Sequence, residues 1–287
     1  GTGLPGSVRL HFAFDYFRNS DFLFVGDTNE SVGGTLALGV TVHELVELFA
    51  SLHNRGNSNN AGDPVLLQSV GELLVGAKVH TELLPWLAVG ADVRLAFVNT
   101  VGDLGLVLGG TSVGLRGALT ADLRRIEQPV PLLLRANLDY YFDNSSELIE
   151  ETEASRLASL GAVMASDESR HLVTRIERFA FDINRVDMLT LGLGVEAPLE
   201  AARDFYVHPL LEWRMGIPVN RQDYSCLLVP TGASAAGPDG CLAREGLASA
   251  PSTLTLGVRA LPPVSGLSAF LGLDIGLLGT GTFVREL

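Results

Sequence analysis

Residues 188–197 read MLTLGLGVEA, and an apolar side chain recurs at every second position of this stretch. These positions are Leu189, Leu191, Leu193 and Val195, and the residues between them are Thr190, Gly192, Gly194 and Glu196. Because successive side chains of a strand point to opposite faces, the stretch predicts a β-strand with one apolar face. A soluble sandwich, a lipocalin-like barrel and a membrane barrel all produce this pattern, and they differ in which face meets water.

The same alternation recurs along the whole chain. Further strands are predicted at 7–17, 32–42, 45–54, 69–81, 86–98, 109–124, 131–142, 205–217, 252–261 and 267–277. Alternation in nearly every segment predicts an all-β chain that forms a single domain over 1–287. Counting back by twos from Leu189 continues the apolar stripe to Phe179, which favours one long strand over 178–197. A short helix followed by a strand is the competing interpretation.

Short and long connections take turns along the chain. Short ones are predicted at 43–44, 82–85, 125–130, 198–204 and 262–266, and longer polar ones at 18–31, 55–68, 99–108, 143–177 and 218–251. Every second connection of an antiparallel meander lies at the same end, so all the long loops are expected at one end. Such an asymmetry is typical of outer-membrane barrels, which have short periplasmic turns and long extracellular loops.

The apolar faces of the predicted strands are expected to contact lipid. Hydrophobic residues make up 47% of the chain, yet no run approaches the ~20 apolar residues of a membrane helix. Lys78 is the only lysine, which is unusual for a solvated surface. A soluble barrel or sandwich is the alternative, but it would need an oversized core. We therefore expect an antiparallel transmembrane β-barrel of about 12 strands, with about 10 to 14 compatible, in a bacterial outer membrane with its long loops extracellular.

Aromatic residues that could lie at the membrane interface are few, with Tyr16, Trp86, Tyr140, Tyr141, Tyr206 and Trp213 as the candidates.

The stretch RFAFDINRVDMLTLGLGVEAPL at 178–199, followed by LLEWRMGIPVNRQ at 210–222, resembles the N-terminal barrel of OmpA-family outer-membrane proteins of the myxobacterial type. In that family a peptidoglycan-binding domain often follows the barrel, so peptidoglycan is expected as a partner only if a downstream domain exists. Family barrels usually end on an aromatic residue, whereas this sequence ends GTFVREL. An even strand number needs one strand more than the eleven predicted, and residues 280–287 either begin it or the chain stops early.

The faces opposite the apolar stripes are expected to line the lumen. Their predicted inward charges are Arg9, Lys78, Arg94, Arg116, Arg124, Arg135, Arg214 and Arg259 against Asp15, Glu47, Glu72, Asp92, Asp122, Asp139, Glu196, Glu212 and Asp274. Eight cations against nine carboxylates predict a nearly neutral lumen filled by paired side chains, with a small water-filled passage as the alternative. Gly192 and Gly194 are expected to leave room for neighbouring lumen side chains.

The long loops are expected to carry any specific function, because binding residues concentrate on loops held by a rigid scaffold. Loops 143–177 and 218–251 would form an extracellular cap. A disulfide between Cys226 and Cys241 would close a loop of about 15 residues and stabilise it by roughly 3 kcal/mol. Phe179, Phe181 and Ile183 would either pack under a neighbouring loop or form a surface for another protein.

Catalysis and cofactors are not expected. His11, His80 and His208 have no spacing that links them to a nucleophile, no cluster has metal-ligand spacing, and the glycine-rich strands are not phosphate loops. The net charge of −13 argues against nucleic acid as a partner. The sequence thus favours a non-enzymatic envelope anchor or scaffold that contacts lipid and presents a cap to another envelope or cell-surface protein. A small porin is the alternative, and a barrel enzyme is less favoured.

Overall fold

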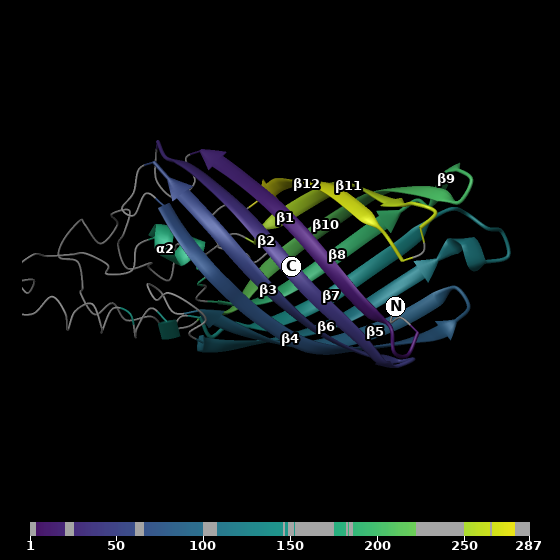
Figure 1. The fold of residues 1–287 in the computed structure, drawn as a ribbon, viewed down its shortest axis with the longest axis horizontal. Coiled ribbons are helices and arrows are strands. Elements are labelled where there is room, and N and C mark those ends of the chain that lie inside the picture. Colours follow the sequence, from purple (N-terminus) through teal and green to yellow (C-terminus); the bar gives the residue numbers. More distant parts are fainter. Residues whose placement is uncertain are drawn as a thin grey trace, which may run out of the picture.

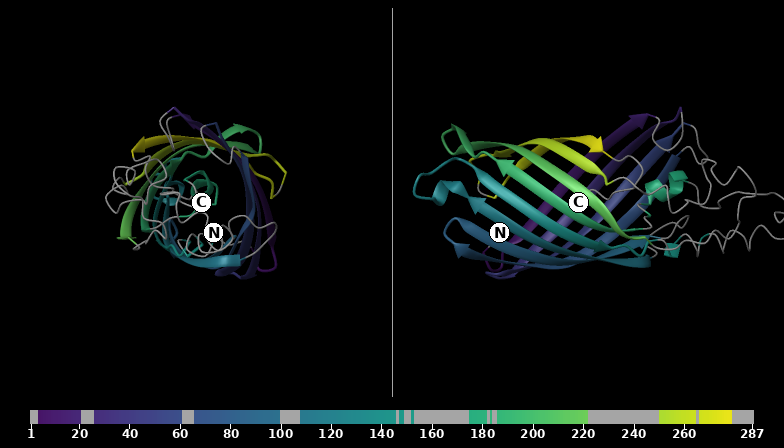
Figure 2. Two further views of the ribbon diagram at one scale, coloured as in Figure 1. Left: turned by 90° about the vertical axis from the view of Figure 1, so that its left-hand side faces the viewer. Right: turned by 180° about the vertical axis from the view of Figure 1, so that it is seen from behind.

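The fold is seen in a computed structural model that describes residues 4–20, 26–60, 66–99, 108–145, 147–148, 152, 175–181, 183, 186–221, 250–264 and 266–278. These residues form a single antiparallel sheet that curls into a barrel (Figure 1, Figure 2). The strands are β1 (Val8–Ser20), β2 (Thr28–His43), β3 (Val46–Asn59), β4 (Leu66–Leu84), β5 (Leu87–Asn99), β6 (Leu108–Asp122), β7 (Leu133–Phe142), β8 (Val186–Glu196), β9 (Leu199–Ala202), β10 (Phe205–Arg221), β11 (Ser252–Leu261) and β12 (Ala269–Leu278). The prediction of an all-β barrel of about 12 strands is confirmed.

The topology is an up-and-down meander in which each long strand pairs with its neighbours in the chain. The order runs from β1 to β8 and then through β10, β11 and β12, while the short β9 pairs only with β10. Tight turns join the strands at one end, which we call the short-turn end, and the longer connections lie at the other (Figure 1). Among the described residues no pairing joins β1 to β12, and these two edges run in the same direction because the path between them has an odd number of strands.

The apolar faces point outward and the polar faces point into the barrel. On β7, Leu134 and Leu138 are exposed, whereas Asp139 is buried. On β2, Leu36 and Leu38 are exposed, while Thr41 is buried on the opposite face. This phase matches the predicted alternation. The small buried clusters of apolar residues lie near the long-loop end, so side chains on the inner wall take the place of a large hydrophobic core.

One long strand over 178–197 was the favoured prediction, and it is wrong. The structure has the helix α2 over Arg175–Ala180, and β8 begins only at Val186. The physical reason is that Phe179, Phe181 and Ile183 do not continue the outward stripe but turn toward the barrel interior, where Phe181 and Ile183 are buried. The competing interpretation, a short helix followed by a strand, describes this segment.

The strands also reach further toward the long-loop end than predicted. β1 continues to Ser20 and β2 begins at Thr28, so both ends of the predicted loop 18–31 are strand. β3 and β4 likewise shorten the predicted loop 55–68. Polar residues in these stretches, such as Asn29 and Asn57, are buried strand residues whose side chains are hydrogen-bonded, and they do not mark a loop. At the other end, β6 stops at Asp122 and a 3-10 helix, η1, covers Leu123–Arg125, so the predicted strand 109–124 is two residues too long.

Glycines on the inner wall make room for long charged side chains. A Cβ placed on Gly192 would lie 3.7 Å from the side chains of both Arg214 and Asn137. A Cβ on Gly194 would meet Arg135 and Glu212 side chains at 3.9 Å. These contacts confirm the role expected for the two glycines.

Gly114 and Gly117 on β6 provide a matched test of this crowding. A Cβ on inward Gly114 would lie 3.0 Å from the Nε of Arg94, whereas the nearest atom to a Cβ on outward Gly117 is the Leu138 carbonyl oxygen at 4.0 Å. We expect Gly114→Val to cost about 1–3 kcal/mol through overpacking and Gly117→Val to cost much less. Thermal unfolding followed by circular dichroism would measure both, and equal losses would contradict a crowded inner wall.

Candidate functional site: the inner wall of the barrel

The central feature of the inner wall is a row of alternating charges on directly opposed residues, which we call the charge row. Glu47 on β3 stands opposite Lys78 on β4, and Lys78 stands opposite Asp92 on β5. The row continues from Asp92 to Arg116 on β6 and from Arg116 to Asp139 on β7. Opposite charges at directly opposed positions attract one another across strands, so the row supports the register of five successive strands.

Arg94 ties the deep part of the charge row together. Its guanidinium lies 2.5 Å from the Asp139 carboxylate and 3.3 Å from Asp92, and its side chain is only 4% exposed. Asp92 also accepts a hydrogen bond from the Nε of Arg116 at 2.6 Å. At the start of the row, Glu47 pairs with both Arg9 and Lys78 and is almost completely buried. These buried charges thus have oppositely charged partners on the same strand or on strands one or two positions away in the sheet, as their desolvation requires.

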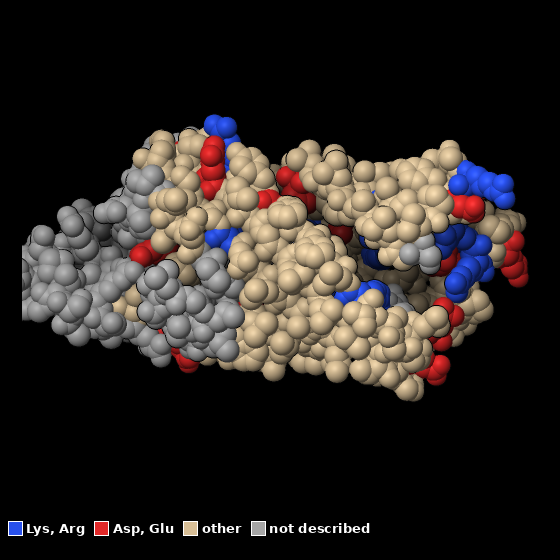
Figure 3. All heavy atoms as spheres, viewed as in Figure 1, with Lys and Arg blue, Asp and Glu red and all other residues tan. Residues whose placement is uncertain are grey.

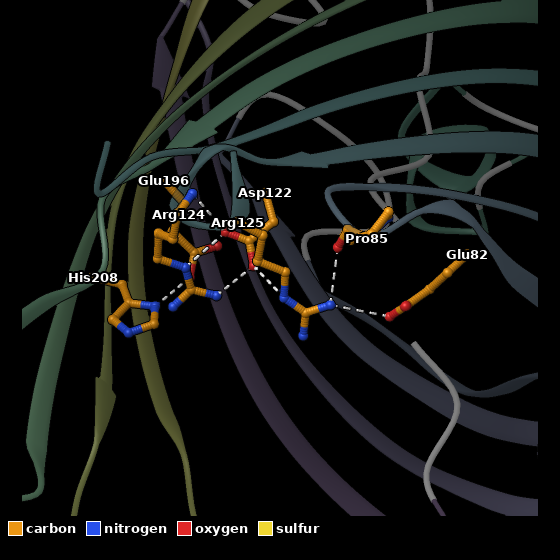
Figure 4. A network of polar contacts seen from close by, with 7 residues as sticks. All are labelled: Glu82, Pro85, Asp122, Arg124, Arg125, Glu196 and His208. Atoms are coloured by element: carbon orange, nitrogen blue, oxygen red, sulfur yellow. Dashed lines mark hydrogen bonds and ion pairs between the residues drawn. The ribbon is translucent and has the colours of Figure 1, made fainter. Parts of the chain in front are cut away.

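A second cluster surrounds Glu196, at the short-turn end of β8. Its carboxylate forms an ion pair with Arg135 and accepts a hydrogen bond from the Nδ1 of His208 at 2.6 Å. It also lies 3.5 Å from the guanidinium of Arg259. Figure 4 shows Glu196 and His208 beside the arginines of η1. Strands β7 and β11 therefore place arginines, and β10 places a histidine, around one carboxylate.

Arg124 and Arg125 of η1 extend the Glu196 cluster to the turn. Asp122 accepts hydrogen bonds from the Nε and NH2 of Arg124, both at 2.8 Å, and lies 3.5 Å from the Nε of Arg125. The hydrogen bond with Asp122 raises the pKa of the Arg124 guanidinium, so Arg124 keeps its charge at every physiological pH. Arg125 also reaches Glu82 and the carbonyl oxygen of Pro85 on the neighbouring turn (Figure 4).

The other predicted lumen charges take separate places on the wall. Asp15 occupies the space over Gly33 on β2, and Glu72 stands opposite His53. Arg214 lies 3.4 Å from Glu212 and 3.9 Å from Asp274, whose carboxylate also accepts a hydrogen bond from Thr255. The structure therefore joins most of the predicted lumen charges into several local ion-pair clusters.

The long-loop mouth holds a small apolar cluster, which we call the cap core: Leu148, Ala180, Phe181 and Ile183, with Leu67 packed against them. Leu148 lies against Gly110 of β6, and the backbone of Asn144 donates to the Ser112 hydroxyl on the inner wall. On the far wall, Arg55 of β3 donates to the Phe179 carbonyl oxygen and lies 5.7 Å from the Phe179 ring centroid. The start of the predicted loop 143–177 and the segment that follows its end thus both pack at the mouth.

Burial decides between the two alternatives for Phe179, Phe181 and Ile183. Phe181 and Ile183 are 8% and 1% exposed, and the Phe179 ring packs 5.8 Å from that of Phe17. They are therefore not an exposed partner surface, because their apolar side chains are already used in packing.

A buried polar cluster beneath the long loops was not predicted. Asn29 and Asn57 exchange hydrogen bonds between their side-chain amides, and the Asn59 amide donates to both Asp27 and Asn29. All four side chains are essentially inaccessible to solvent. The signal in the sequence was the spacing of two between Asn57 and Asn59, which places both on one face of a strand.

The three histidines do not come together. His11 lies on β1, His80 on β4 and His208 on β10, on well-separated parts of the sheet. In the described part of the chain no group of three His, Cys, Asp or Glu side chains has the arrangement of a metal site. None of the helices in that part combines the length and apolarity needed to cross a membrane. The predicted Cys226–Cys241 disulfide, most of the 218–251 loop and residues 280–287 lie outside the described residues.

Removing Arg94 should destabilise the barrel strongly, because Asp92 and Asp139 would lose a buried partner. We expect Arg94→Met to cost about 3–5 kcal/mol in the free energy of unfolding. Arg18→Met is the matched control, since Arg18 pairs with Glu30 at 3.4 Å on the exposed surface and such pairs contribute less than about 1 kcal/mol. Equilibrium unfolding in guanidinium chloride measures both; equal losses would refute a stabilising role for the buried charges.

Comparison with protein-family models gives no match for this chain, and comparison with curated proteins finds no relative. The resemblance to the OmpA-family barrel therefore stays a prediction from the strand pattern. The fold and the arrangement of the inner wall are the basis for any functional assignment.

Proposed function

We propose that the chain is an outer-membrane β-barrel that acts as a non-enzymatic anchor or scaffold of the cell envelope and uses its long loops for recognition at the cell surface. The observation that carries this proposal is the inversion of polarity, with leucines outside and ion pairs inside. Leu115, Leu138 and Leu193 are exposed on the outer face by 46%, 54% and 47%. An apolar surface that continues around a barrel is costly in water and is favourable in lipid.

Strand length and pairing between neighbouring strands support the same location. Crossing a bilayer takes ~9–11 residues of tilted strand, and the long strands here contain between 10 and 19 residues. In lipid the backbone groups must be paired within the sheet, and a meander of neighbouring strands supplies these hydrogen bonds. The short-turn end would then face the periplasm and the cap core would lie beneath the extracellular loops.

The ion-paired side chains on the inner wall favour a scaffold over an open channel. Deep carboxylates are paired with cations from nearby strands, and the segments that form the cap core contact both β6 and β3. The expected partners are outer-membrane lipid and another envelope or cell-surface protein, with peptidoglycan only through a downstream domain. No catalytic role is proposed for the histidines, since a fold by itself does not imply chemistry.

A depth-dependent substitution tests the membrane location. Leu138 lies near the middle of β7, while Leu199 is an exposed leucine of β9 at the short-turn end. We expect Leu138→Arg to lower the free energy of folding into phospholipid vesicles by about 2–4 kcal/mol, and Leu199→Arg by about 0–1 kcal/mol. Unfolding titrations in vesicles measure the difference.

Two results would overturn this location. One is a wild-type protein that stays monodisperse without detergent and shows no heat-modifiable mobility on gels. The other is an equal effect of the two arginine substitutions on folding into vesicles.

A small porin is the second candidate, because several lumen cations are partly accessible to solvent. Conductance in planar bilayers separates the two functions. We expect wild-type protein to give no stable stepwise channels, and Ile183→Asp to increase conductance by disrupting the cap core. Val264→Asp, at an exposed turn position of the opposite end, is the control and should not change conductance. Stable wild-type channels would favour the porin.

A further inference from the structure

The charges at the short-turn mouth are not equally accessible. Three carboxylates, Glu47, Asp122 and Glu196, are at most 14% exposed. The cations that contact them are 34–54% exposed, and we call them the cation ring: Arg9, Lys78, Arg124, Arg125, Arg135 and Arg259. Counting charges in the sequence predicts a nearly neutral lumen, and that prediction misses this layering.

Each carboxylate serves as an anchor beneath more than one cation. Glu47 holds Arg9 and Lys78 from one side of the mouth. Glu196 holds Arg135 and Arg259. Asp122 holds the two arginines of η1. Six cations over three carboxylates leave a net excess of three positive charges facing the opening.

The cation ring lies inside the tips of the turns. Figure 3, a side view, shows Lys and Arg side chains around a hollow between the β1 and β12 edges toward the short-turn end, with acidic side chains nearer the tips of the turns. The exposed turn carboxylates are Glu44, Glu82, Glu127, Glu200 and Asp204. Of these, Glu82 reaches the ring through Arg125 at 3.3 Å. The ring, its three anchoring carboxylates and Glu82 together carry six positive and four negative charges.

Five of the six ring members are arginines, and this sets the chemistry of the ligand. A guanidinium has five N–H donors in a planar fork, so it can hold a buried carboxylate on one side and still offer donors on the other. Forks of this kind match the oxygens of phosphate groups better than a single ammonium does. Low-dielectric walls around the mouth also concentrate the positive potential.

We propose that the short-turn mouth binds a small phosphate-bearing anion of the pyrophosphate type through the cation ring. The anion lies over the guanidinium groups and displaces none of the anchoring carboxylates. The binding does not rest on the membrane location, because the ring and its anchors belong to the inner wall of the barrel in any surrounding.

Isothermal titration of the full chain with pyrophosphate, at low salt in a zwitterionic detergent, tests this site. Arg124→Gln combined with Arg125→Gln removes two ring cations without touching the long strands. We expect this variant to bind pyrophosphate about tenfold more weakly or worse, since two charge-assisted contacts are lost. Arg18→Gln combined with Arg203→Gln removes the same charge from two exposed arginines outside the ring and should change the affinity less than about twofold.

Several outcomes would overturn the proposal. One is that the wild-type chain does not bind pyrophosphate at millimolar concentration. Another is that the two double variants lose affinity equally, because the effect would then come from net charge alone. Displacement of pyrophosphate by detergent micelles doped with phosphatidylglycerol would assign the ring to lipid headgroups. Circular dichroism of both double variants checks that each retains its β-sheet. A protein that is soluble without detergent would refute the membrane location, but the pyrophosphate titration would still test the cation ring.

Discussion

Attraction between opposite charges on directly opposed strands is the interaction on which the inner wall depends. In the charge row, Lys78 stands between Glu47 and Asp92, and Arg116 stands between Asp92 and Asp139. Because side chains alternate with a period of two, a slip of one residue in any strand would place its charges on the apolar outer face. The same alternation that sorts leucines outward therefore holds the strands in register from the inside.

Most of the fold could be predicted from the sequence because the period-two pattern carries it. The outward positions of β2 and β7 follow directly from alternating leucines, as the exposed Leu38 and Leu138 show. The pattern fails over 178–185, where apolar residues at Phe179, Phe181 and Ile183 fit either element. The choice there depends on contacts with the inner wall and with Leu148, which lies far away in the sequence.

The candidate site was predictable as a set of residues but not as an arrangement. Alternation places Arg135 and Glu196 on the inner face, yet it does not reveal that two arginines and a histidine surround Glu196. Arg125 was missed because the predicted strand 109–124 ran past the real end of β6, where η1 turns the chain. The cations lie nearer to solvent than the carboxylates because the arginine side chain is longer. It extends past a carboxylate that stays close to the wall.

The meander has a consequence for how the barrel assembles. Each long strand pairs with long strands next to it in the chain, and ion pairs such as Lys78–Glu47 and Arg116–Asp92 join these same neighbours. Other ion pairs, such as Arg9–Glu47 and Arg94–Asp139, reach across one intervening strand. Loop-closure entropy is therefore small for the hairpins joined by tight turns, and the pairing of β1 to β7 needs no contact between distant parts of the chain. The sheet can grow one hairpin at a time, with each added strand selecting its partner by the charge already displayed at the edge.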